Sequence, residues 1–182
     1  VEYQLQGYGK STHISHGGKP GFAGRMWNIE KVEKDAVTLS YLSPDGENGF
    51  PGNLQVYLTY RLTDDNALDL TYTATTDKPT VLNLSHHSLF NISGNFNQTV
   101  ENQMMWIDAE RMTPYDEKKC VTGDYMDVEG TPFDFRLPQA VGARIDEEND
   151  QLKVTRGYDH AWVLNTQGDD QCVAAWIYDA ES

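Results

Sequence analysis

The sequence predicts an all-β protein with antiparallel strands, organised as a single domain over residues 1–182. Two observations support this class. Apolar residues alternate with polar ones in several segments, which is the period of a strand that buries one face. Groups of Gly, Pro, Asn and Asp separate these segments, and such residues form turns. We therefore expect hairpins and short loops with little helix.

The clearest strands form one hairpin. Leucine, valine and tyrosine alternate with polar residues over residues 54–62, and the alternation resumes over residues 68–74 after the turn at residues 63–66. This pattern is typical of an antiparallel pair with one buried face. Other strands are expected at residues 26–32, 36–42, 81–85, 103–109, 161–164 and 172–178, and a short helical turn at residues 139–145.

The segment 43–53 has the densest turn chemistry of the chain. Its acidic residues Asp45 and Glu47 raise the alternative of a calcium loop. The order of the residues does not fit the EF-hand pattern. We therefore expect a plain turn that joins two strands.

Charge and composition limit the partners of the protein. Fourteen Lys and Arg residues stand against 28 Asp and Glu residues, a formal net charge of -14. This balance argues against nucleic acid and anionic membrane surfaces as partners, and mildly against a phosphorylated substrate. No apolar run approaches the roughly 20 residues of a membrane span, and no secretory signal is visible. We expect a soluble, cytoplasmic protein, and reduced thiols at Cys120 and Cys172 with one disulfide left open.

The most informative chemistry lies at residues 83–94, where hydroxyl and amide groups surround a histidine pair. Histidine titrates nearest to physiological pH and can transfer a proton during turnover. If residues 81–87 form a strand, alternation places His87 on a polar face with Ser85, and His86 on the face toward the core. His87 is therefore the predicted acid or base.

All five histidines fall in three short segments: His13 and His16, His86 and His87, and His160. Two glycines directly follow His16, so the backbone can approach a ligand closely while the imidazole bonds a hydroxyl. Asp159 precedes His160, and its charged carboxylate is suited to paired hydroxyls. The alternative for Asp159 is a turn residue that accepts from backbone amides.

A zinc site is the competing interpretation of the histidines. His13, His16, His86 and His87 offer enough nitrogen ligands. Adjacent residues of a strand point to opposite faces, however, and do not readily share one ion. We therefore expect neither a metal nor another cofactor.

Residues 83–94 resemble the aldose 1-epimerase (galactose mutarotase) family motif Asn-Leu-Thr-Asn-His-Ser-Tyr-Phe-Asn-Leu-x-Gly, with His86 in place of asparagine and Leu89 in place of tyrosine. His16 and its glycines resemble the family's Asn-x-Leu-His-Gly-Gly, and residues 157–164 its Gly-x-Asp-His-x-Phe-Val-Leu. Residues 130–135 match Gly-Thr-Pro-Phe-Asp-Phe, in which we expect core phenylalanines and a local contact of Asp134 with Arg136. The resemblance runs in order from about residue 3 to residue 182.

The resemblance implies an antiparallel β-sandwich of the galactose mutarotase type, a supersandwich of which this chain would be an incomplete, internal part. It implies an isomerase that interconverts the α and β anomers of a hexose such as galactose or glucose. His87 would be the acid, with His16, Asp159 and Phe90 binding the sugar. The family's base is a glutamate that Glu181 does not match, so we expect the chain alone to be weakly active or inactive. Unpaired strand edges would then allow self-association.

Two other functions stay open at this point. A noncatalytic carbohydrate-binding β-sandwich could stack sugars on tryptophan, although most tryptophans of a β-domain lie in the core. The four candidates are Trp27, Trp106, Trp162 and Trp176. A relative of the sugar-phosphate epimerases would need a basic pocket, which the charge balance does not favour.

Overall fold

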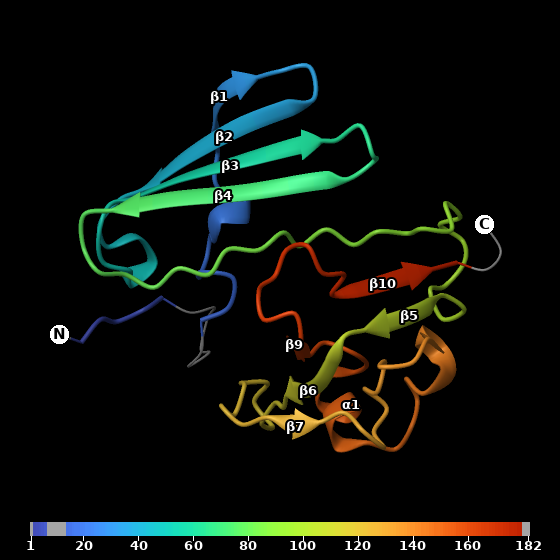
Figure 1. Cartoon of the computed structure of the whole chain (residues 1–182). Helices are drawn as coiled ribbons and strands as arrows, with labels where there is room; N and C mark the ends of the chain where they lie inside the picture. Colours follow the sequence, from blue (N-terminus) through green and yellow to red (C-terminus); the bar gives the residue numbers. More distant parts are fainter. Residues whose placement is uncertain (1, 7–13, 180–182) are drawn as a thin grey trace. The chain divides into compact units, whose positions relative to one another are not determined.

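The computed structural model describes residues 2–6 and 14–179 of the chain (Figure 1). The chain divides into two compact units, Val1–Ser88 and Leu89–Ser182, each of which is described by itself. Strands pair in the antiparallel sense in both units, and the α-helix α1 (Asp150–Thr155) has only 6 residues. The predicted all-β, antiparallel class is confirmed. The single domain over residues 1–182 stays a prediction.

The first unit is built on one sheet whose strands follow each other in the order β1-β2-β3-β4. Its strands are β1 (Asn28–Val32), β2 (Ala36–Ser43), β3 (Leu54–Leu62) and β4 (Leu68–Thr76). The predicted hairpin is confirmed, since Leu54 lies opposite Thr76 and Leu62 opposite Leu68. Leu54, Val56 and Leu58 are buried, as the alternation predicts for one face of β3.

The segment between β2 and β3 is a turn held by its own acidic residues. It contains the 3-10 turn Glu47–Gly49, and a second such turn, Phe22–Gly24, precedes β1. The Asp45 carboxylate accepts from the backbone N–H of Gly52 at 2.6 Å and pairs with Lys78. The Glu47 carboxylate accepts from the Tyr41 and Ser43 hydroxyls. Both acidic residues therefore bond protein groups, as expected of a plain turn.

The second unit contains two three-stranded sheets, in the orders β10-β5-β8 and β7-β6-β9. The strands are β5 (Met104–Ile107), β6 (Ala109–Thr113), β7 (Met126–Asp127), β8 (Gln139–Ala140), β9 (Ala161–Leu164) and β10 (Ala175–Tyr178). Asp108 joins β5 to β6, and its backbone bonds Ala174 and Asn165 at 2.9 Å each. One continuous stretch of chain thus passes from one sheet into the other.

Two sequence predictions of local structure are wrong, and one element was not predicted. Residues 81–85 form no strand, and Val81 is 78% exposed. The expected helical turn at residues 139–145 is strand β8 followed by the 3-10 turn Val141–Ala143. Helix α1 was not predicted, because so short a helix buries only Leu152 and shows no apolar period.

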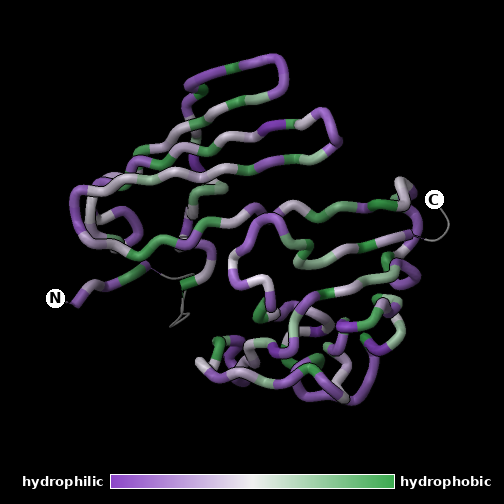
Figure 2. The backbone as a smooth tube through the Cα atoms, viewed as in Figure 1, coloured by the Kyte–Doolittle hydropathy of each residue, from purple (hydrophilic) through white to green (hydrophobic). Residues whose placement is uncertain are grey.

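The core of the second unit consists of two neighbouring apolar clusters. One contains Met112, Val128, Phe133 and Leu152, the other Ile107, Ala109 and Phe135, and Tyr158 and Trp162 pack against both. Figure 2 shows apolar and polar residues interspersed along the strands, without a long apolar run. In the part of the chain that the structure describes, no helix is long and apolar enough to cross a membrane.

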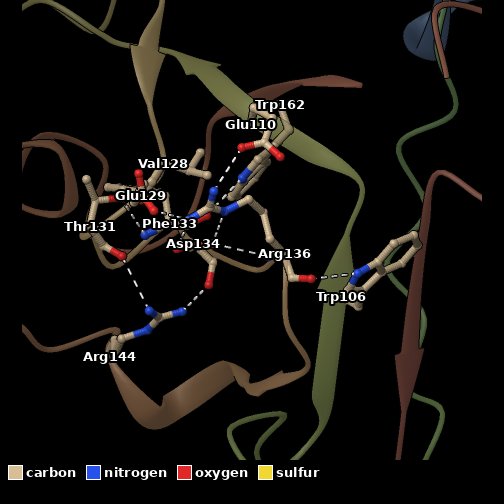
Figure 3. Close-up of polar contacts among 10 residues, drawn as sticks. All are labelled: Trp106, Glu110, Val128, Glu129, Thr131, Phe133, Asp134, Arg136, Arg144 and Trp162. Carbon is tan, nitrogen blue, oxygen red and sulfur yellow. Dashed lines mark hydrogen bonds and ion pairs between the residues drawn. The ribbon is translucent and has the colours of Figure 1, made fainter. Parts of the chain in front are cut away.

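A polar cluster fixes residues 131–136 against β6 (Figure 3). The Arg136 guanidinium bonds Asp134 through Nε and Nη2, both at 2.8 Å, and Glu110 through Nη1 at 2.8 Å. The hydrogen bond from Arg136 holds the pKa of the Asp134 carboxyl below its usual range. With Phe133 and Phe135 buried, the predicted structural interpretation of this motif is confirmed.

Candidate functional site

His16 and His87 lie together in the first unit. Their ring centroids are 5.3 Å apart, and the rings meet edge to face at 62°. Both residues are exposed. The structure therefore brings two of the predicted site residues, far apart in the sequence, onto one surface where both imidazoles are accessible to a ligand.

His86 points to different surroundings from its neighbour. It is half-buried, and its ring centroid lies 5.7 Å from that of Tyr60 on β3. Its Nε2 is 3.2 Å from the Ser88 hydroxyl. His86 is less exposed than His87, in the direction predicted, but it is half-buried and belongs to neither core cluster, and the strand from which the division was argued does not form. His87 alone of this pair meets His16.

The two glycines that follow His16 allow the backbone to turn with positive φ angles. Gly17 and Gly18 have φ values of 74° and 92°, in the left-handed region that favours glycine. A Cβ atom on Gly18 would lie 2.7 Å from the carbonyl oxygen of Gln6, which is too close. A Cβ on Gly17 would meet nothing within 4 Å, so its positive φ, and not crowding, favours glycine there.

A largely covered carboxylate, with a side chain 10% exposed, anchors the neighbouring turn to the sheet. Glu47 accepts hydrogen bonds from Tyr41 at 2.7 Å and Ser43 at 2.6 Å, and pairs with Arg25 at 2.8 Å. Burial, reinforced by the hydrogen bond and charge of Glu47, raises the pKa of Tyr41 from 10.0 to about 12. Glu47 is thus engaged with the protein and is no candidate for the catalytic base.

This network predicts that the Tyr41 phenol ionises at a higher pH than an ordinary tyrosine. We expect the phenol of Tyr41 to ionise near pH 12, and its pKa to fall in Glu47→Gln while staying above 10.0, because burial is the largest cause. Since folding raises this pKa, the stability it contributes is intact below pH 10 and is lost as the pH rises toward 12. Absorbance at the phenolate band, compared with Tyr41→Phe, measures it. A Tyr41→Phe protein that keeps the last-titrating phenol contradicts the assignment.

Asp159 and His160 have opposite environments in the second unit. Asp159 is exposed, and no hydrogen bond to its carboxylate is found among the described residues, so the turn-capping alternative has no support there. His160 is 9% exposed, with its ring 4.5 Å from Phe133 and 5.1 Å from Tyr115. The predicted ligand-binding residue is therefore accessible, and the histidine beside it is a core residue.

Hydrogen bonds assign the neutral form to His160. Its Nδ1 accepts from the Asp159 backbone N–H at 3.4 Å, which places the ring hydrogen on Nε2, 3.1 Å from Gln151 Oε1. The Gln151 side chain also bonds the backbone N–H and carbonyl of Tyr115, at 2.8 and 3.0 Å. Burial lowers the pKa of His160, against a smaller opposing effect of the Asp159 charge.

The stability of the protein should depend on pH through His160. Because folding lowers this pKa below 6.5, the stability that the neutral ring contributes is complete above that pH and is lost as the pH falls. We expect denaturant unfolding to show a shallower loss between pH 7.5 and 5.5 in His160→Gln than in the parent. His86→Gln is the matched control. An identical pH slope in the parent and His160→Gln would contradict the buried neutral histidine.

The remaining predicted site residues are placed as follows. Phe90 is 68% exposed and belongs, with Asp159, to the second unit, so its grouping with the histidine pair stays a prediction. His13 lies outside the described residues. Within residues 2–6 and 14–179, no group of three His, Cys, Asp or Glu residues could hold a metal ion. Cys120 and Cys172 are free thiols.

A cavity of about 420 Å³ lies elsewhere in the first unit. Its lining is mostly apolar and consists of Tyr3, Leu5, Phe50, Pro51, Pro79, Thr80 and Val81. None of the predicted site residues lines it. A hexose needs several convergent polar groups, so we do not assign the sugar site to this cavity.

Nearly the whole chain matches the model of one protein family. The sequence model of "Aldose 1-epimerase" matches residues 1–181. The chain belongs to the aldose 1-epimerase family. It is 40% identical over 166 residues to the aldose 1-epimerase of Escherichia coli strain K12, covering 91% of this chain and 47% of that protein. It is 35% identical over 163 residues to the galactose mutarotase of Homo sapiens, covering 90% and 45%.

A solved structure extends the likeness to the aldose 1-epimerase fold. The galactose 1-epimerase of Lactobacillus acidophilus NCFM superposes with a TM-score of 0.80 at 30% identity, covering 92% of this chain and 48% of that one. The chain thus spans about half the length of the relatives it matches.

Two side-chain amides that bond the segments around His16 and His160 were not predicted from the sequence. Asn48 bonds the turn after His16, and Gln151 bonds His160. A single amide in a turn or on a short helix carries no local signal, because its partners lie elsewhere in the sequence.

Proposed function

We propose that the protein interconverts the anomers of a hexose, galactose or glucose, by acid and base catalysed ring opening. His87 is the acid at the ring oxygen, and His16 and Asp159 bind sugar hydroxyls. The observation that carries the proposal is the edge-to-face contact of His16 and His87, 5.3 Å apart with both rings exposed. One imidazole can then bind the sugar while the other transfers a proton.

The reaction needs one proton to leave the sugar and one to enter it. A base takes the proton of the C1 hydroxyl, C1 becomes a carbonyl, and the bond from C1 to the ring oxygen breaks as His87 protonates that oxygen. Rotation about the C1–C2 bond presents the other carbonyl face. The ring oxygen then attacks C1, His87 takes its proton back, and the base returns a proton to the new C1 hydroxyl.

We expect the 182 residues alone to turn over slowly. Glu181 does not match the glutamate that serves as base in the aldose 1-epimerases, and Glu47 is engaged with Tyr41, Ser43 and Arg25. A positioned acid contributes about 10² to 10⁴ fold on its own, so water acting as base should leave a measurable rate.

The test follows freshly dissolved α-D-galactose and α-D-glucose by polarimetry with and without the protein. The proposal predicts a saturable acceleration over buffer for at least one sugar. Saturation-transfer NMR measures binding of the same sugars in parallel. Binding without acceleration would contradict turnover by these residues with water as the base, and the absence of both would contradict any role in hexose chemistry.

A carbohydrate-binding module is the second candidate, and one observation favours it. Trp106 and Trp176 stack with ring centroids 6.3 Å apart at 21°, and Trp176 is 38% exposed. A flat aromatic surface of this kind can stack on a sugar ring. Loss of sugar binding in Trp176→Ala, but not in His16→Ala, would select this function over the first.

A further inference from the structure

We propose that Asn48 is a positioning residue for His16: its side-chain amide holds the turn that directs the His16 imidazole to His87. We call the hydrogen bonds from the Asn48 amide to this turn the Asn48 clamp. The role of His16 in sugar binding rests on the proposed function, whereas the clamp rests on contacts within the first unit.

The side-chain amide of Asn48 donates two hydrogen bonds to the turn that follows His16. Asn48 Nδ2 donates to the carbonyl of Gly17 at 2.7 Å and to the carbonyl of Pro20 at 3.0 Å. These carbonyls lie one and four residues after His16. A single side chain from a distant segment thus fixes both ends of the stretch that follows the histidine.

Asn48 is itself held rigidly. Its φ of 51° lies in the left-handed region, which Asn adopts more readily than most residues. Its carbonyl accepts from the Gln6 backbone N–H at 2.9 Å. The preceding Glu47 carboxylate accepts from Tyr41 and Ser43 of β2, so the clamp is fastened to the sheet.

The His16 turn combines one backbone hydrogen bond, from the Gly18 N–H to the Ser15 carbonyl at 3.0 Å, with the two from Asn48. His16 is exposed and has a φ of 51°, an uncommon conformation for a residue with a side chain. The turn curls so tightly that a Cβ on Gly21 would lie 2.0 Å from the His16 carbonyl oxygen. Without the Asn48 amide, we expect the turn to relax and the His16 ring to leave His87.

The variant Asn48→Asp tests the clamp with the least change of shape. It preserves the size and the tolerance of positive φ, but places carboxylate oxygens against two carbonyls. We expect loss of the nuclear Overhauser contacts between the His16 and His87 rings and about tenfold weaker galactose binding, the effect of one lost hydrogen bond of ordinary strength. Asn48→Gly, which accepts the same φ without adding charge, should give the same loss.

Asn66→Asp is the matched control, because Asn66 also has a positive φ, 64°, in the exposed turn between β3 and β4. It should keep both the ring contacts and the galactose affinity. The proposal is overturned if Asn48→Gly and Asn48→Asp fold and retain the His16–His87 contacts. If those contacts vanish but His16→Ala binds galactose like the parent, the clamp stands and the sugar-binding role of His16 fails.

Discussion

His87→Gln is expected to abolish the acceleration of galactose mutarotation while the protein stays folded and still binds the sugar. Glutamine can bond a hydroxyl, but it does not titrate near neutral pH and cannot protonate the ring oxygen. The loss should be the whole acceleration over buffer that the parent chain shows, since no other group of the proposal protonates the ring oxygen. Because His87 is exposed, the substitution should cost little stability.

The neighbouring histidine supplies the control for this experiment. His86→Gln alters the same segment at a half-buried residue that faces Tyr60 and not His16. Polarimetry should show that it keeps the parent rate. A folded His87→Gln protein that retains the parent rate would exclude His87 as the acid.

Phe133→Ala is expected to destabilise the second unit by about 3 to 5 kcal/mol, the cost of removing a buried aromatic ring. Phe133 has an exposed fraction of 0% and contacts Tyr158, His160 and Trp162, at ring distances of 5.5, 4.5 and 6.3 Å. The substitution would leave a cavity beside Tyr158 and His160, the residues on either side of Asp159. Denaturant unfolding, monitored by tryptophan fluorescence, measures the change.

Phe96→Ala is the matched control for the core substitution. Phe96 is 88% exposed, so its removal should change the free energy of unfolding by less than about 0.5 kcal/mol. A Phe133→Ala protein as stable as Phe96→Ala would contradict the burial of Phe133 in the core cluster.

Alternation along the chain predicted the strands whose own residues decide their burial. Residues 54–62 and 68–74 show it most clearly, and there β3 and β4 pair in the expected register. Residues 81–85 also contain spaced apolar side chains, yet no strand forms because none of the described segments pairs with them. Pairing is a non-local property, and local β propensity does not determine it.

The candidate site was predictable as far as its chemistry is local. Clustered polar groups indicated His87, His16 and Asp159, and the family resemblance gave them roles. The contact of His16 with His87 was not predictable from spacing, since it depends on how the turn after His16 folds. That turn is held by Asn48, whose hydrogen bonds to Gly17 and Pro20 exist only in the folded chain.

Under the proposed function, the His16 and His87 imidazoles form a hexose-binding surface. Histidine side-chain NMR during a titration with D-galactose tests it most directly, with galactitol, which has no sugar ring, as the control ligand. We predict that the His16 and His87 signals shift together along one saturation curve with galactose and stay unchanged with galactitol. Galactose binding that leaves both signals unmoved would contradict the claim.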